Sequence, residues 1–179
     1  MLAARQTVPA ALTQAWSDAI GAHLLQRFPE APGQCVGFCW PIRNEPDLRA
    51  ALKTWQAVLA LPVVVDVPPL LRFCRWTPEM PMTPDRYGIP TPVDGDPVTP
   101  DVLLIPLVAF DAAGYRLGYG GGFFDRTLAT LHPRPLAIGI GFELNRVASL
   151  PTQPHDQPMD WIVTERGIWQ TRSCSKKSR

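Results

Sequence analysis

A glycine cluster that follows a long apolar run is the feature that most limits how this chain can fold. Residues 101–110 (DVLLIPLVAF) have the length and the β-branched content of a buried strand. Four glycines then fall within five residues, at Gly118, Gly120, Gly121 and Gly122. Apolar side chains recur after them at helical spacing, at Phe123, Phe124, Leu128 and Leu131. The glycines are therefore predicted to lie where a strand gives way to a helix.

A junction of this kind favours an anion-binding site. Glycine lets backbone N–H groups point into one concavity, and the N-terminus of the next helix adds about half a positive charge. Arg116 and Arg126 would supply bidentate phosphate contacts, and Asp125 beside them indicates a cation that it shares with the phosphates. Tight turns are the alternative explanation of the glycines. The cluster matches neither the P-loop nor the dinucleotide-binding fingerprint, because Phe123 replaces the last glycine of the second pattern.

The rest of the chain alternates between helical and strand patterns. We expect helices over residues 3–28 and 45–59, the second capped by Asn44, and strands over residues 34–40, 61–67, 70–76, 135–142 and a pair within 160–171. Residues 78–100, rich in proline, aspartate and glycine, are expected to form an irregular loop, either a surface excursion or a wall over a site. This alternation predicts one α/β domain over residues 1–172, three-layered α/β/α with a mainly parallel, Rossmann-like sheet.

Charge and hydropathy narrow the choice of partners. With 17 Lys and Arg against 16 Asp and Glu, the 179-residue chain offers no broad basic surface for nucleic acid. Basic residues concentrate only in residues 173–179, which we expect to be a disordered tail. No apolar stretch approaches the roughly 18 to 20 residues of a membrane helix, and no signal-peptide pattern is present. We therefore expect a cytoplasmic protein, monomeric or weakly dimeric, with small-molecule substrates and without nucleic-acid or membrane partners.

The cysteines and histidines do not point to a metal site. Cys35, Cys39, Cys74 and Cys174 lack paired C-x-x-C spacing, so free thiols in a reducing compartment are expected. His23, His132 and His155 have no metal-ligand spacing to one another, and His155 is expected to be structural or to face solvent.

The stretch RLGYGGGFFDRTL, preceded by PLVAFD and by an earlier YGIPTP, closely resembles the signature of the 5-formyltetrahydrofolate cyclo-ligase family, also called methenyltetrahydrofolate synthetases. The resemblance extends from about Leu2 to Gly167. It implies a ligase that uses ATP and Mg²⁺ to convert 5-formyltetrahydrofolate into 5,10-methenyltetrahydrofolate, with release of ADP and phosphate. In the mechanism usually drawn, the formyl oxygen attacks the γ-phosphate, N10 of the folate closes on the activated carbon, and phosphate leaves.

The resemblance also implies roles for particular residues. The ATP-binding segment would comprise Arg116, Leu117, Gly118, Tyr119, Gly120, Gly121, Gly122, Phe123 and Phe124. Arg116 and Asp125 would be catalytic, and Asp125 and Asp156 would bind magnesium. Folate would contact Glu45, Tyr87, Gly118, Tyr119 and Gly120. From the residues alone, Asp156 could equally be a turn residue, and Glu45 a partner of a helix dipole.

The N-terminus departs from the family pattern. Members typically open with a basic segment, a Lys and a nearby Arg, that contributes to nucleotide and folate binding. The opening MLAARQTVPAAL has no counterpart of that pair, and Arg5 aligns with a later position. Either the start codon lies further upstream or the protein has lost a phosphate-binding arm, and the second case leaves open a weak or inactive folate- or nucleotide-binding paralogue of the same fold. An unrelated sugar-phosphate enzyme is a further alternative, because a glycine nest alone cannot choose among phosphates.

Overall fold

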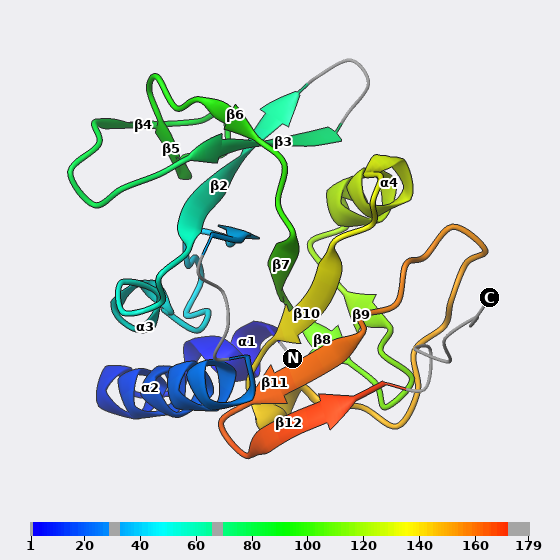
Figure 1. Ribbon diagram of the computed structural model, residues 1–179. Helices are drawn as coiled ribbons and strands as arrows, with labels where there is room; N and C mark the ends of the chain where they lie inside the picture. The colour runs from blue at the N-terminus through cyan, green and yellow to red at the C-terminus, as the bar shows by residue number, and fades with distance from the viewer. Residues whose placement is uncertain (1, 29–32, 66–69, 172–179) are drawn as a thin grey trace.

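The computed structural model describes residues 2–28, 33–65 and 70–171, and an eight-stranded sheet runs through them (Figure 1). Its strand order is β12-β11-β10-β7-β1-β2-β3-β6. The strands are β1 (Cys35–Gly37), β2 (Val58–Val65), β3 (Leu70–Arg75), β6 (Pro97–Val98), β7 (Val102–Pro106), β10 (Leu136–Ile140), β11 (Trp161–Thr164) and β12 (Gly167–Gln170). The five central strands, from β11 to β2, pair in parallel, whereas β12, β3 and β6 pair antiparallel to their neighbours.

Helices cover both faces of this sheet (Figure 1). On one face, Ile20 and Leu24 of α2 (Ala10–Arg27) pack in the same cluster as Leu104 of β7 and as α3 (Arg49–Leu52). On the other face, Leu128 of α4 (Phe123–Thr130) packs with Leu103 of β7. Because successive side chains of a strand point to opposite faces, an apolar run such as β7 serves both layers. The predicted three-layer α/β/α architecture with a mainly parallel sheet is confirmed.

Most of the predicted strands form, usually over fewer residues. The expected strands over residues 34–40, 61–67, 70–76 and 135–142 appear as β1, β2, β3 and β10, and the final pair as β11 and β12. Residues 66 and 67 of the second prediction lie outside the described residues, as does the predicted tail at 173–179. Within the described part of the chain, no helix is long and apolar enough to cross a membrane.

The single helix predicted over residues 3–28 is two helices. α1 (Leu2–Gln6) ends before Val8, and α2 begins directly after Pro9. Proline lacks a backbone N–H and disfavours the helical conformation in the residue before it, so the helix cannot continue through Val8 and Pro9.

The helix predicted over residues 45–59 is wrong for most of its length, since only the four residues of α3 are helical. Arg43 and Asn44 adopt positive φ angles of 49° and 63°, which end any regular structure there. The Asn44 side chain does not cap a helix. It donates instead to the backbone carbonyls of Arg5 and Val8, at 2.8 Å and 3.2 Å.

The irregular loop predicted over residues 78–100 is partly regular. β4 (Met82–Pro84) and β5 (Pro90–Pro92) form an antiparallel hairpin, and β6 extends the sheet beside β3. The carboxylate of Asp85 accepts hydrogen bonds from the backbone N–H groups of Tyr87 and Ile89 and so closes the hairpin turn. Prolines are tolerated here because these strands are short and lie at sheet edges.

Candidate active site

The glycines follow a small hairpin rather than the central strand itself. β7 ends at Pro106, and β8 (Ala109–Phe110) and β9 (Arg116–Leu117) pair before the chain enters the glycine loop, residues 118–122, and α4. The turn that follows β1 carries Glu45. The hydroxyl of Tyr119 donates a 2.7 Å hydrogen bond to Oε1 of Glu45, so the two loops meet beside the carboxyl ends of parallel strands. Ligands of open α/β sheets bind at such an edge.

The glycine loop is open to solvent. All five of its residues are exposed, and a Cβ atom added at Gly118 or Gly120 would meet no atom within 4 Å. Gly120 and Gly122 have φ angles of 89° and 60°, and Gly122 is the residue before the first turn of α4. The loop therefore places backbone amides and a helix N-terminus at a free surface, as an anion site requires.

Arg126 folds back on this loop. Its Nη2 donates to the carbonyl of Gly121 at 2.6 Å, and its guanidinium lies over the ring of Phe123. The side chain thus supports the bend, in addition to the phosphate contact predicted for it.

Arg116 joins β9, the start of α4 and the segment before β11. Its Nη2 lies 3.1 Å from Oδ1 of Asp125, and its Nη1 donates to the carbonyl of Gln157 at 2.8 Å. The N–H of Gln157 in turn donates to the same Oδ1 at 2.9 Å. Only 7% of the Arg116 side chain is exposed. Burial lowers the pKa of this guanidinium, and the charges of Asp125 and Asp156 oppose the shift.

Asp156 lies in a turn, as one of its two alternative interpretations predicted. Its Oδ2 accepts a 2.7 Å bond from the N–H of Gln153, so it does form a turn. It is also close enough to Arg116 for its charge to oppose the lowering of the Arg116 pKa by burial. His155 beside it is exposed, with Nε2 3.8 Å from the Asp156 carboxylate, as expected of a histidine that faces solvent.

The donor set at this cluster suits a magnesium ion bound partly by phosphate. Asp125 and Asp156 supply carboxylate oxygens, and the Arg116 and Gln157 contacts of Asp125 both fall on Oδ1. Among the described residues, no group of three or more His, Cys, Asp or Glu side chains could hold a metal ion. Mg²⁺ is commonly held by one or two carboxylates together with substrate phosphates and water, so two aspartates suffice when a polyphosphate is present.

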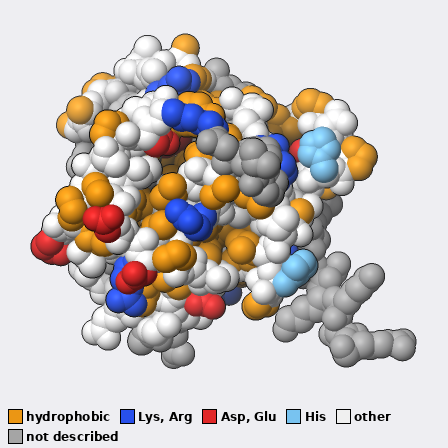
Figure 2. Space-filling model, turned by 90° about the horizontal axis from the view of Figure 1, so that it is seen from above, with side chains coloured by type: hydrophobic (Ala, Val, Ile, Leu, Met, Phe, Trp, Pro, Cys, Tyr) orange, Lys and Arg blue, Asp and Glu red, His pale blue; other side chains and the backbone are white. Residues whose placement is uncertain are grey.

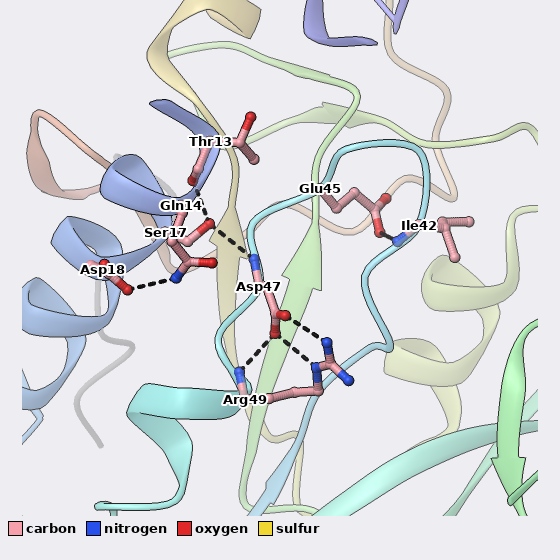
Figure 3. A network of polar contacts seen from close by, with 8 residues as sticks. All are labelled: Thr13, Gln14, Ser17, Asp18, Ile42, Glu45, Asp47 and Arg49. Atoms are coloured by element: carbon pink, nitrogen blue, oxygen red, sulfur yellow. Dashed lines mark hydrogen bonds and ion pairs between the residues drawn. The ribbon is translucent and has the colours of Figure 1, made fainter. Parts of the chain in front are cut away.

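Glu45 lies in a buried polar network, with 4% of the residue exposed. Its Oε2 accepts the backbone N–H of Ile42 at 3.0 Å (Figure 3), and its Oε1 lies 3.7 Å from Nη2 of Arg5. Burial raises the pKa of the Glu45 carboxyl group. The Tyr119 hydrogen bond, the Ile42 N–H and the charges of Arg5 and Arg43 oppose that shift.

Helix α2 supports the segment that carries Glu45 (Figure 3). Ser17 accepts the backbone N–H of Asp47 at 3.1 Å and donates to the carbonyl of Thr13 at 2.7 Å. The Asp47 carboxylate accepts two side-chain bonds from Arg49, at 2.9 Å and 2.7 Å. These contacts fix the chain between Glu45 and α3 without any regular structure.

Tyr87 is not brought to the other predicted residues. It lies in the turn of the β4–β5 hairpin with 58% of its surface exposed, and it contacts Asp85 and the guanidinium of Arg86.

Two buried polar residues were not predicted from the sequence, and the first of them belongs to this site. Arg5 of α1 is 1% exposed and contacts both Tyr119 and Glu45. Its hydrogen-bond partners lie 38, 102 and 114 positions away, so no local pattern could have identified it. Asn145 in the short helix η1 (Glu143–Asn145) is fully buried, and neither atom of its side-chain amide has a hydrogen-bond partner among the residues that the structure describes.

Two hollows differ in character. A cavity of about 20 Å³ beside Glu45 is lined by Phe38, Cys39, Leu104 and Ile140 among others, and is large enough for about one water molecule. A groove of about 370 Å³ lies between β3, β6 and α4, and none of the predicted site residues is among those that line it. Figure 2 views the molecule from above and shows hydrophobic side chains around the hollowed middle of that face.

Several known proteins are similar to this chain in sequence and fold. The sequence profile of the 5-formyltetrahydrofolate cyclo-ligase family matches residues 1–165. The 5-formyltetrahydrofolate cyclo-ligase of Haemophilus influenzae is 40% identical over 95 residues, which are 50% of this chain and 51% of that protein. The chain thus spans about half the length of this relative. The cyclo-ligase of Mycolicibacterium smegmatis is 29% identical over 183 residues, 94% of this chain and 92% of that protein.

A solved structure extends the likeness to nearly the whole fold. The 5,10-methenyltetrahydrofolate synthetase of Aquifex aeolicus superposes with a TM-score of 0.83 at 27% identity, over 99% of this chain and 92% of that one. The family match covers more than half of the sequence, including the glycine loop, Glu45 and Asp156. The chain therefore belongs to the 5-formyltetrahydrofolate cyclo-ligase family.

Proposed function

We propose that the protein converts 5-formyltetrahydrofolate into 5,10-methenyltetrahydrofolate, with ATP hydrolysed to ADP and phosphate and Mg²⁺ as cofactor. One observation carries the proposal most: the Tyr119–Glu45 hydrogen bond joins the glycine loop to a buried carboxylate. One end of this arrangement suits a polyphosphate and the other suits a ring with N–H donors. A reduced pterin and ATP are substrates of that description.

The phosphate end is formed by the amides of the glycine loop and by Arg116. The segment from Arg116 through Leu117 and the four glycines to Phe123 and Phe124 would follow the triphosphate, with the N-terminus of α4 directed at it. Arg116 is held by Asp125 and by the Gln157 carbonyl, so its guanidinium is already oriented before the nucleotide binds. Orientation of this kind lowers the barrier because little rearrangement is needed during phosphoryl transfer.

Asp125 and Asp156 would hold the magnesium ion. When bound, the ion would neutralise charge on the phosphate oxygens during transfer. Asp125 also holds Arg116 in place and the charge of Asp156 acts on the same guanidinium, so the proposed phosphate and metal sites share Arg116 and Asp125.

The folate end is formed by Glu45, with Gly118, Tyr119 and Gly120 beside it. A carboxylate accepts hydrogen bonds only, which complements the N–H groups of a pterin. Each Glu45 oxygen has one protein N–H or O–H donor and a second lone pair for a ligand. Tyr87 would reach the ligand only through movement of the exposed β4–β5 turn, and it has the weakest support of the proposed folate contacts.

The reaction itself asks little of a side-chain nucleophile. The formyl oxygen attacks the γ-phosphorus and ADP leaves. N10 of the folate then attacks the activated carbon, loses its proton, and phosphate departs with the former formyl oxygen. The protein's part is to hold the formyl oxygen in line with the γ-phosphate and to keep water away from the activated carbon.

Product formation tests the proposal directly. Purified protein mixed with 5-formyltetrahydrofolate, ATP and Mg²⁺ should develop the near-ultraviolet absorbance of methenyltetrahydrofolate over many turnovers. With ¹⁸O in the formyl group, the label should appear in the released phosphate. Folded protein that binds folate without releasing ADP would instead be the non-catalytic paralogue, and unlabelled phosphate would rule out phosphorylation of the formyl oxygen.

A further inference from the structure

Arg5 is the most completely buried charged residue of the described chain that the proposed function does not use. It belongs to α1, and 1% of its surface is exposed. A buried guanidinium is costly unless its donors are paired, so its partners indicate why it is there.

Each of the three guanidinium nitrogens of Arg5 reaches a different segment of the site. Nη1 donates to the carbonyl of Leu107, directly after β7, at 3.1 Å. Nε donates to the carbonyl of Arg43 at 3.1 Å, and Nη2 donates to the hydroxyl of Tyr119 at 2.6 Å. Arg5 thus connects the central strand, the turn before Glu45 and the glycine loop.

The turn before Glu45 needs such support. Arg43 and Asn44 have φ angles of 49° and 63°, and two successive non-glycine residues in this region are strained. Asn44 Nδ2 donates back to the carbonyls of Arg5 and Val8, so contacts run in both directions between this turn and the N-terminal segment. Strain of this kind persists where the surroundings determine the conformation several times over.

We propose that Arg5 is a positioning residue for the folate site: through Arg43, Leu107 and Tyr119 it fixes the turn that presents Glu45, and it places a positive charge 3.7 Å from the Glu45 carboxylate. The proposal rests on the folate role proposed for Glu45. Arg5 itself does not touch the reacting atoms.

The charges that surround Glu45 also support a positioning role for Arg5. Four titratable groups face Glu45 from the elements around it: Arg5 from α1, Arg43 from its own turn, Tyr119 from the glycine loop and Cys39 from the chain after β1. Burial, and then Glu45, raise the pKa of the Cys39 thiol, so Cys39 stays neutral. Burial raises the pKa of Glu45, whereas the Tyr119 hydrogen bond and the charges of the two arginines lower it.

The test compares variants that separate charge from geometry. Arg5→Met removes both the charge and the hydrogen bonds, whereas Arg5→Lys keeps a charge but cannot reach three acceptors. Asn44→Gly keeps the positive φ accessible and removes the side-chain bonds to the carbonyls of Arg5 and Val8. Arg27→Met is the control, because Arg27 packs on Phe28 and Trp161 at the end of α2, outside the site. Calorimetry with 5-formyltetrahydrofolate across pH gives the affinity, and circular dichroism reports folding.

We expect Arg5→Met to weaken folate binding roughly 10- to 100-fold and to move the midpoint of its pH dependence upward, because the Glu45 anion loses its nearest stabilising cation. Arg5→Lys should restore the midpoint but only part of the affinity. Asn44→Gly should weaken binding roughly 3- to 10-fold without moving the midpoint, and Arg27→Met should bind as the parent does.

A folded Arg5→Met protein with parental folate affinity, or with an unchanged midpoint, would overturn the proposal. If Arg5→Met does not fold, parental affinity in Asn44→Gly would overturn it. The proposed function fails separately: a parent protein that binds folate but makes no methenyltetrahydrofolate contradicts the reaction, while the binding comparison still decides the role of Arg5. A parent that does not bind folate overturns both.

Discussion

The hydroxyl of Tyr119 accepts a hydrogen bond from Arg5 and donates one to Oε1 of Glu45, although Tyr119 and Glu45 are 74 positions apart in the sequence. Tyr119 belongs to the exposed glycine loop, and Glu45 to a buried turn on the other side of β7. A ligand that replaces the hydroxyl at Glu45 would free the glycine loop to change its shape. The proposed folate end and the proposed phosphate end of the site are therefore connected through one side chain.

Removal of this hydroxyl should reduce stability. Tyr119→Phe deletes the bond to a carboxylate and one partner of Arg5, and since Tyr119 is 45% exposed we expect a loss of about 1 kcal/mol in the free energy of unfolding. Urea unfolding followed by tryptophan fluorescence measures it. Tyr87→Phe is the matched control, at an exposed turn, and should change stability by less than about 0.5 kcal/mol. Equal effects at both positions would mean that the network contributes nothing.

The Tyr119 hydroxyl should lose its proton at a higher pH than an ordinary tyrosine. Burial, followed by the charge of Glu45 and its hydrogen bond, raises the pKa of Tyr119 from 10.0 to about 12, against the opposing effect of Arg5. Because the pKa is higher in the folded state, the stabilising contribution is complete below pH 10 and is lost as the pH rises through about 12. Phenolate absorbance of the parent minus that of Tyr119→Phe isolates this group. A midpoint near 10 in the difference curve would contradict the hydrogen-bonded arrangement.

Gly120 and Gly118 form a matched pair for testing the glycine loop. A Cβ atom fits in open space at both, but only Gly120 has a positive φ, of 89°. Gly120→Ala should therefore strain the loop by about 1 kcal/mol or more and weaken the binding of a non-hydrolysable ATP analogue at least severalfold. Gly118→Ala should bind it more nearly as the parent does. The reverse order of affinities would show that the backbone conformation at Gly120 is not what the nucleotide requires.

Replacement of Asn145 by an apolar residue should stabilise the protein. Its side-chain amide is fully buried and has no hydrogen-bond partner in the described part of the chain, a situation that costs about 1–3 kcal/mol. Asn145→Leu keeps the branching at Cγ and should raise the free energy of unfolding by about 1 kcal/mol, measured by urea unfolding. A loss of more than about 1 kcal/mol would mean that the amide has a partner in solution.

The sequence predicted the sheet well because its strands are continuous apolar runs whose side chains pack on both faces, as in β7 and β10. It failed where tertiary contacts decide local structure. Asn44 is a good helix cap by type, yet its side chain bonds to α1 and its backbone takes a positive φ. Pro9 did carry a local signal, a helix break, that the periodicity of the flanking residues outweighed.

The residues of the candidate site were likewise predicted from the sequence only in part. Arg116, the glycines and Asp125 lie within one short segment and could be recognised together, and the structure places Asp156 and Glu45 beside them. Arg5 could not be found, because it becomes part of the site only when β7, the Arg43 turn and the glycine loop are folded against α1. A role for Tyr87 followed from the motif alone, and the structure leaves it at an exposed turn.

The most direct test of the proposed phosphate and metal site is the turnover of Asp125→Ala, measured by methenyltetrahydrofolate absorbance and ADP release at saturating Mg²⁺. Asp18→Ala is the control, since Asp18 is an exposed residue of α2 that bonds to Gln14. We expect Asp125→Ala, folded as the parent is, to lose turnover by about 100-fold or more, while Asp18→Ala retains it. Turnover of Asp125→Ala within about threefold of the parent would refute the proposed site, because the carboxylate would then hold neither the metal nor Arg116 for the reaction.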